Sequence, residues 1–267
     1  MNAPATALPT VFVSHGAPNL ILHDSPARDF LAGFGKSLPR PRAILTVSAH
    51  FETARPAVVA DDHPEMIYDF GGFERELYTL VYPAPGSREI AEGVAARLAE
   101  AGLGPEIVAR RGYDHGVWVP LMLMFPDADI PVVQLSVQPG RSAAEHLALG
   151  RALASLREEG ILVVGSGSFT HNLRAVFGPG GLAPVDAEVP AWVSEFADWM
   201  TGSILEGDEK KLLDWERAPY AHQNHPTDEH LMPLFVAIGA AGEGWASKQV
   251  HSSHQYGALM LDAFRFD

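Results

Sequence analysis

Histidines are the residues of this sequence with the widest range of possible chemistry. The chain has 12 histidines and no cysteine among its 267 residues, so imidazoles and carboxylates are the only side chains that could hold a metal ion firmly. His15, His50 and His171 each follow a short apolar run that is typical of a buried strand. Because neutral imidazole binds borderline metals, we expect these three side chains to contribute to a mononuclear site for ferrous iron or zinc.

Two further segments combine histidine with possible partners. His115 is preceded by Tyr113 and Asp114, either of which could orient its ring. Glu229 and His230 are adjacent and precede a long apolar run that is typical of a helix. Neighbours on a helix point about 100° apart, so we expect only one of the two to reach a given metal ion.

The remaining histidines carry a weaker signal. His146 lies in the middle of a predicted helix among small apolar residues, and we expect it at the surface. His222 and His225 are three residues apart in a polar segment. That spacing is compatible with either a metal site or an ordinary loop.

Short apolar runs must position these side chains. Continuous apolar runs of this length are typical of strands that are buried on both faces of a sheet. Ligand sites in such sheets gather beyond the carboxyl ends of the strands, so the histidines that follow them are expected at one rim. The predicted strands are Thr10–Ser14, Ala43–Ser48, Pro131–Val137 and Ile161–Gly165.

Helical signals lie between and after the predicted strands. Ser25 can cap a helix that begins with Pro26, and a serine followed three residues later by a glutamate opens another helix as a capping box. The other predicted helices are Gly86–Gly102, Ser142–Gly160, Val189–Ser203 and Thr227–Gly242, the last capped by Thr227. Alternating strands and helices predict an α/β fold with a central, mostly parallel or mixed sheet and helices on both faces. We expect residues 1–267 to form a single domain.

Composition excludes several classes of partner. The formal net charge is −14, which disfavours binding to nucleic acid and to anionic membrane surfaces. The N-terminal segment MNAPATALPT has neither a basic region nor a long apolar run, so we expect no signal peptide and a cytoplasmic protein. The partners we expect are small molecules.

Five motifs in this order resemble the class III extradiol ring-cleaving dioxygenases, and specifically the DOPA 4,5-dioxygenase type. The resemblance runs almost from end to end of the chain. The motifs are Ser14–Pro18 (SHGAP), Ser48–Glu52 (SAHFE), Tyr113–Trp118 (YDHGVW), Gly165–Leu173 (GSGSFTHNL) and His225–Leu234 (HPTDEHLMPL).

The resemblance implies a set of metal ligands. His15 and His50 match two of the family's ligands, and the third falls on His230 rather than on Glu229. His171 matches the family's essential histidine and is either a fourth ligand or an acid/base beside the metal. Fe(II) is expected for activity, and Zn(II) can occupy such a site.

The resemblance also implies a reaction and further site residues. The substrate would be a catechol whose ring is opened with dioxygen; L-DOPA cut between carbons 4 and 5 would give seco-DOPA, which cyclises to betalamic acid. His115 is a second catalytic candidate beside His171. In the C-terminal segment, His254 and Tyr256 are candidate substrate contacts.

Two other functions stay open on the residues alone. A zinc hydrolase could use the same histidines, with Glu52 or Glu229 as the base. A non-catalytic binding protein could also share the scaffold. An amino-acid substrate would need a cation for its carboxylate, for which we consider Arg110, Arg111 and Arg174, although solvated surface charges are the expected state of all three.

Overall fold

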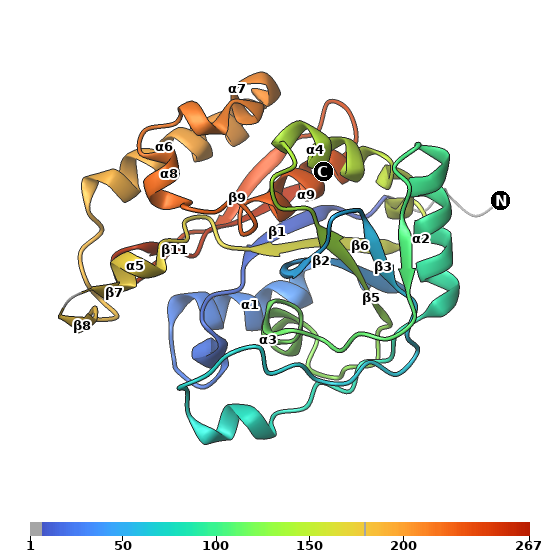
Figure 1. The fold of residues 1–267 in the computed structure, drawn as a ribbon, viewed down its shortest axis with the longest axis horizontal. Helices are drawn as coiled ribbons and strands as arrows, with labels where there is room; N and C mark the ends of the chain where they lie inside the picture. The colour runs from blue at the N-terminus through green and yellow to red at the C-terminus, as the bar shows by residue number, and fades with distance from the viewer. Residues whose placement is uncertain (1–6, 179) are drawn as a thin grey trace.

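The computed structural model describes residues 7–178 and 180–267. Its centre is an eight-stranded sheet with the strand order β4-β3-β5-β2-β6-β1-β12-β9 (Figure 1). The middle strands β5, β2, β6 and β1 run parallel to one another, whereas β12 and β9 join antiparallel at one side. The strands of this sheet are β1 (Thr10–Ser14), β2 (Ala43–Glu52), β3 (Ala57–Val59), β4 (Glu106–Val108), β5 (Val132–Val137), β6 (Ile161–Gly167), β9 (Ser247–His251) and β12 (Ala263–Phe266).

Two strands extend beyond their predicted ends. β2 continues to Glu52 and β6 continues to Gly167, because both remain paired with neighbouring strands past the apolar run. His50 therefore lies inside β2 and does not follow it, which corrects our expectation. The pairing of β2 with β5 shifts register between Ser48 and Glu52, around His50. Such a shift locally re-aims side chains.

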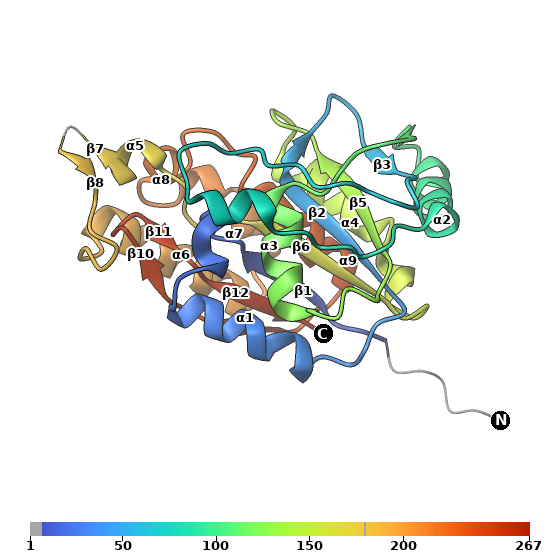
Figure 2. The ribbon, with the colours of Figure 1, turned by 90° about the horizontal axis from the view of Figure 1, so that it is seen from below.

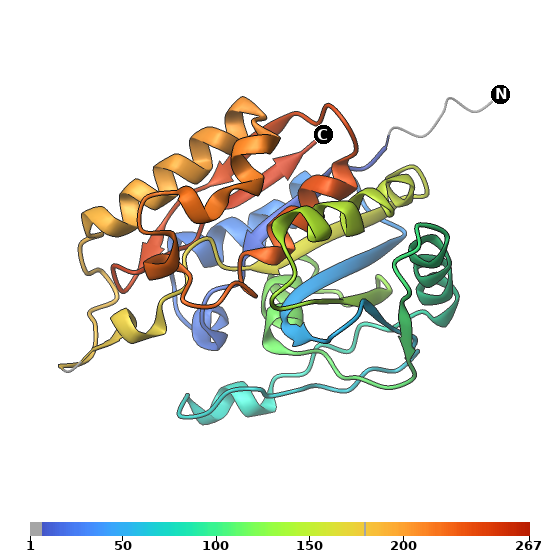
Figure 3. The same cartoon turned by 45° about the horizontal axis from the view of Figure 1, so that its top comes forward.

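Helices cover both faces of the sheet, which confirms the predicted α/β class with a mixed sheet. α1 and α3 pack on one face (Figure 2), and α4, α6 and α9 lie over the other (Figure 3). The helices are α1 (Pro26–Ser37), α2 (Arg88–Glu100), α3 (His115–Met124), α4 (Ala143–Arg151), α5 (Leu173–Val176), α6 (Ala191–Glu206), α7 (Glu209–Leu213), α8 (Ala221–Asn224) and α9 (Met232–Ala241). The 3-10 turns are η1 (Pro18–Ile21), η2 (Arg75–Thr79), η3 (Ala154–Arg157) and η4 (Trp215–Arg217), and two small sheets pair β7 (Phe177–Gly178) with β8 (Gly181–Leu182) and β10 (His254–Gln255) with β11 (Leu259–Met260).

Two predicted helix starts agree with the structure. The Ser25 hydroxyl accepts from the Arg28 backbone N–H at the start of α1. The Ser142 hydroxyl and the Glu145 side chain form a complete capping box at the start of α4. The predicted end of that helix is wrong, because α4 stops at Arg151 and the chain then packs Leu153 and Leu156 into the core through η3.

The last helix, α9, begins later than predicted. Proline lacks a backbone N–H and fits only the first turn of a helix, so Pro233 sets the start at Met232. Thr227 does not cap it; its hydroxyl donates to the Glu229 carboxylate at 3.1 Å. Glu229 and His230 consequently lie in a turn, and our argument from helical spacing does not apply to them.

Within the described part of the chain, no helix has the length and apolar character needed to cross a membrane. Most of the N-terminal segment in which we looked for a signal peptide, residues 1–6, lies outside the described residues.

Candidate metal and catalytic site

The site lies where β2, β6 and β1 end side by side at one rim of the sheet. His15 directly follows β1, and its backbone N–H donates to the Gly167 carbonyl at the end of β6, at 2.9 Å. Ser168, which follows Gly167, donates its backbone N–H to the His230 carbonyl at 2.9 Å. The His171 N–H donates to the Asn224 carbonyl at 3.0 Å. Backbone hydrogen bonds thus join histidines that are far apart in the sequence.

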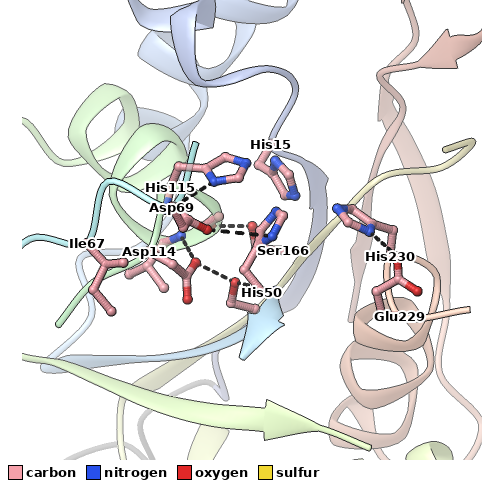
Figure 4. Close-up of polar contacts among 12 residues, drawn as sticks. His15, His50, Ile67, Asp69, Asp114, His115, Ser166, Glu229 and His230 are labelled. Carbon is pink, nitrogen blue, oxygen red and sulfur yellow. Dashed lines mark hydrogen bonds and ion pairs between the residues drawn. The ribbon is translucent and has the colours of Figure 1, made fainter. Parts of the chain in front are cut away.

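The rings of His15, His50 and His230 point toward one another (Figure 4). Their centres are 4.9 Å apart for His15 and His50, 5.4 Å for His15 and His230, and 4.8 Å for His50 and His230. His171 stacks on His230 at 3.5 Å with an angle of 12° between the rings. His115 completes the group, with its ring centre 4.0 Å from that of His50.

In His15, His50 and His230 the two ring nitrogens have different surroundings. The Nε2 atoms of His15, His50 and His230 are buried and have no hydrogen-bond partner among the described residues. Their Nδ1 atoms face outward: that of His15 lies 2.8 Å from the Gly16 carbonyl oxygen, and that of His230 lies 2.9 Å from the Glu229 carboxylate. A buried, unpaired polar atom is costly, and a metal ion would satisfy all three.

The donor set therefore fits a metal ion. Nitrogens about 2.1 Å from one ion place their ring centres roughly 5 Å apart, close to the separations observed. Distances between possible ligand atoms alone group His115 with His15 and His50, and His171 with Glu229 and His230, each within 4.8 Å. Burial separates the candidates better, because in the described cluster the Nε2 atoms of His15, His50 and His230 are the ring nitrogens that are both buried and without a hydrogen-bond partner. We therefore group His230 with His15 and His50, and the Glu229 carboxylate contacts Nδ1 of His230.

Burial keeps these histidines neutral. Burial and the neighbouring histidines together lower the pKa of His50 to about 4 and that of His171 to about 3. The pKa values of His15 and His230 lie well below the ordinary value for the same reasons. Neutral imidazoles keep a lone pair for a metal ion or for a proton.

His115 is oriented by a residue that the sequence did not indicate. That residue is Asp69. His115 is the first residue of α3, and its backbone nitrogen and its Nδ1 lie 3.0 and 2.9 Å from Asp69 Oδ1, within hydrogen-bond distance. Burial raises the pKa of Asp69, but its contacts with His115 outweigh that effect and hold the value at about 2. The two predicted partners act elsewhere. Asp114 caps α3 and accepts from Ser48, and the Tyr113 hydroxyl donates to backbone carbonyls.

Arg111 is not a solvated surface charge, contrary to our expectation. Its guanidinium donates to the His50 carbonyl at 3.0 Å and to Gln134 at 2.7 Å, and it pairs with Asp114 at 2.8 Å. It therefore braces the end of β2 and has few donors left for a substrate carboxylate. Arg110 and Arg174 are exposed.

The structure places the other candidates farther from the cluster. His254 is exposed in β10, and Tyr256 follows it with a φ of 56°. Among the described residues neither side chain makes a hydrogen bond or ring contact with the clustered histidines. His222 is exposed, whereas His225 is buried and its Nε2 lies 3.0 Å from the Phe169 carbonyl oxygen.

The expectation for His146 is wrong. Its side chain is only 1% exposed, because its Nδ1 lies 3.0 Å from the Ser142 carbonyl oxygen and its Nε2 accepts from the Gln138 backbone N–H. It joins the start of α4 to the end of β5.

Comparison with known proteins gives consistent matches along nearly the whole chain. The family model described as the catalytic LigB subunit of aromatic ring-opening dioxygenase matches residues 11–262. A 4,5-DOPA dioxygenase extradiol of Beta vulgaris is 41% identical, with 96% of each chain covered. A protein of the same description from Escherichia coli K12 is 38% identical over 88% of this chain and 86% of its own. The crystal structure of an uncharacterized Escherichia coli K12 protein superposes with a TM-score of 0.79 at 32% identity, covering 97% of this chain and 99% of that one.

Proposed function

The chain belongs to the family of the catalytic LigB subunit of aromatic ring-opening dioxygenases, and we propose that it cleaves L-DOPA between carbons 4 and 5. The ring-opening extradiol activity follows from the family and from the names of its relatives. The product of the proposed reaction is seco-DOPA, which cyclises to betalamic acid without an enzyme. The match over residues 11–262 supports a single catalytic domain that spans residues 1–267.

The proposed ligands of the metal ion are His15, His50 and His230. The observation that carries this assignment is the set of three buried, unpaired Nε2 atoms that face one another. Fe(II) is the proposed active metal, and Zn(II) would be an inactive occupant of the same nitrogens. A bound ferrous ion would supply coordination positions for the catechol oxygens and for dioxygen, and a path for electrons from the catechol to dioxygen.

His171 and His115 are the proposed acid/base residues. His171 is stacked on His230 and is neutral at pH 7, so it can accept a proton from a catechol hydroxyl held beside the ligands. His171 could alternatively serve as a fourth ligand, since it lies within 4.8 Å of His230 through its ligand atoms. The His115 ring lies against His15 and His50, where it could take the proton of the second catechol hydroxyl and return it to the opening ring.

Aromatic side chains beside His115 suit a planar substrate. The Phe70 ring lies 5.9 Å from that of His115 and 6.1 Å from that of Trp118. The first pair is edge-to-face and the second is tilted, and aromatic side chains in such arrangements pack well against another aromatic ring. We propose that the catechol enters along this wall, with the exposed His254 and the half-buried Tyr256 contacting its substituent.

The family favours a dioxygenase over the two other functions considered from the sequence, a zinc hydrolase and a binding protein. Oxygen uptake distinguishes the dioxygenase from both. Protein stripped of metal and reloaded with Fe(II) without air is mixed with L-DOPA, caffeate, protocatechuate and catechol and then exposed to oxygen. We expect oxygen uptake with L-DOPA and a yellow product that NMR identifies as betalamic acid. Oxygen uptake with another catechol only would overturn the DOPA assignment, and none with any catechol would overturn the dioxygenase.

A further inference from the structure

Asp69 lies between two histidines of the site. Its Oδ1 lies 2.9 Å from Nδ1 of His115 and 3.0 Å from the backbone nitrogen of the same residue, while its Oδ2 lies 3.7 Å from Nδ1 of His50 (Figure 4). A backbone hydrogen bond of 2.8 Å from Ile67 to Tyr113 ties the Asp69 segment to the start of α3. One carboxylate therefore faces a proposed metal ligand and a proposed acid/base.

The contacts of Asp69 determine which nitrogens carry protons. A carboxylate accepts hydrogen bonds and cannot donate them. The His115 backbone N–H is an obligate donor to Oδ1, and the ring Nδ1 at the same oxygen must donate as well. Nε2 of His115 then keeps its lone pair. The contact with His50 is a charge attraction rather than a hydrogen bond, since its Nδ1 lies 3.7 Å from Oδ2. The carboxylate favours the proton on the nitrogen that faces it, which leaves the lone pair on Nε2, and that atom is buried without a partner among the described residues.

We propose that Asp69 is a positioning residue that holds both His50 and His115 with the proton on Nδ1 and the lone pair on Nε2. For His50 this presents Nε2 to the metal ion. For His115 it presents Nε2 to the substrate, so that the catechol O–H bond breaks, an Nε2–H bond forms, and the resulting imidazolium is balanced by the Asp69 carboxylate. The roles of the two histidines in this inference rest on the proposed function.

A purely structural role for Asp69 has different consequences. In that alternative, Asp69 does no more than cap the start of α3, where its carboxylate accepts a hydrogen bond from the first backbone N–H of the helix. The same chain contains a matched case, because Asp62 accepts from the first backbone N–H of α2, that of Arg88, at 2.8 Å. Asp62 is exposed, and none of its described contacts involves a histidine of the site. Removing Asp62 therefore measures the loss of a cap alone.

The test compares Asp69→Ala, Asp69→Asn and Asp62→Ala in the full chain. NMR of the metal-free proteins with ¹⁵N-labelled histidine reads the proton position on each ring, and zinc titration reads metal affinity. In the wild type we expect His50 and His115 to be protonated on Nδ1. Asp69→Ala should move protons to Nε2 and weaken zinc binding about 10- to 100-fold. Asp62→Ala should change neither.

Asp69→Asn keeps the inference testable if Asp69→Ala fails to fold, because the amide oxygen can still accept the hydrogen bond from the His115 backbone N–H. Its NH₂ group faces His50, so we expect the proton of His50 to move to Nε2 and zinc binding to weaken. Wild-type protein with Nε2-protonated His115, or Asp69 variants that match Asp62→Ala in tautomer and zinc affinity, would overturn the inference. If the tautomers are as expected but no catechol is consumed, the proposed function fails and the role of Asp69 in setting the tautomers stands.

Discussion

At the scale of single residues, the geometry of the site depends on the group that contacts Nδ1 of each imidazole. His15 turns Nδ1 to a backbone carbonyl, His230 turns it to Glu229, and His50 turns it toward Asp69. Each arrangement leaves Nε2 for the ion, and it also fixes the ring plane. Because histidine has two ring nitrogens, the group that contacts one of them determines which nitrogen is available to the metal ion.

His171 is the residue whose loss should separate chemistry from metal binding. We expect His171→Ala to lower kcat by about 10²- to 10⁴-fold, because a positioned acid/base contributes that much. If His171 acts only on protons, the iron content of the variant should match the wild type; if it is a fourth ligand, iron content should fall as well. Exposed His222 provides the control, and His222→Ala should leave both unchanged. Turnover near the wild-type rate in His171→Ala would refute the assignment.

The buried histidines also predict how stability depends on pH. Burial lowers the pKa of His225 to about 4, and it also lowers the pKa values of His15, His50, His171 and His230. Between that value and about 6.5 the unfolded chain binds protons that the folded chain does not. The free energy of unfolding of the metal-free protein should therefore fall as pH decreases from 7 toward 4, by at most about 1.4 kcal/mol per pH unit for each such histidine.

Urea unfolding of chelator-treated protein at pH 7, 6 and 5 measures this dependence. His225→Gln should make it shallower, whereas substitution of the exposed His63 should not. Asp262 has the opposite effect on the free energy of unfolding. Burial raises its pKa to about 6, so its protonation on acidification stabilises the folded protein. It is one group, however, whereas several histidines destabilise the folded protein. A free energy of unfolding that stays constant or increases on acidification would contradict the neutral state of the cluster.

Histidines at or near the end of a strand could be predicted from the sequence, but a partner that comes from an irregular segment could not. The positions of His15 and His50 near strand ends could be predicted. Asp69 could not, because it lies in a segment without regular structure whose path depends on contacts with Tyr113. Its flanking aromatics, Tyr68 and Phe70, were the available signal. Arg111 likewise reads as a surface charge until the fold brings Gln134 and Asp114 to it.

At the scale of elements, β6 and α9 determine how closely His230 approaches the rim. A Cβ on Gly165 would lie 2.3 Å from the Pro233 carbonyl oxygen, and one on Gly167 would lie 2.1 Å from that of His230. Glycines in β6 thus allow the backbone before and within α9 to pack directly on the strand. Element boundaries were the less predictable feature, because strand pairing lengthened β2 and β6, and Pro233 delayed the start of α9.

Gly167→Ala tests this close approach. We expect the added methyl to push the His230 carbonyl away, lower the free energy of unfolding by about 1–3 kcal/mol and weaken metal binding. Gly35→Ala is a matched control, since its Cβ would meet the Met124 carbonyl at 2.0 Å on the opposite face of the sheet. It should lose comparable stability and keep its metal affinity. The two variants are compared by urea unfolding and by zinc titration; equal metal affinities would show that β6 does not position His230.

At the scale of the whole molecule, the mixed sheet places β6 between β2 and β1, although β6 begins more than 100 residues after either of them in the sequence. The alternation of strands and helices was enough to predict the fold class. It could not predict the antiparallel strands β12 and β9, because their side chains give no long apolar run. The family match, from residue 11 to residue 262, includes every strand of this sheet except β12 and the first residue of β1.

We propose that His15, His50 and His230 hold one iron ion at which dioxygen opens a catechol ring. The most direct test is turnover of the Fe(II)-loaded protein with L-DOPA under ¹⁸O₂, with oxygen uptake and product mass measured together. We predict one dioxygen consumed per catechol and ¹⁸O retained in the new carboxylate of the product, with both signals lost in His230→Ala. No oxygen uptake, or a product carrying oxygen from water alone, would contradict the account.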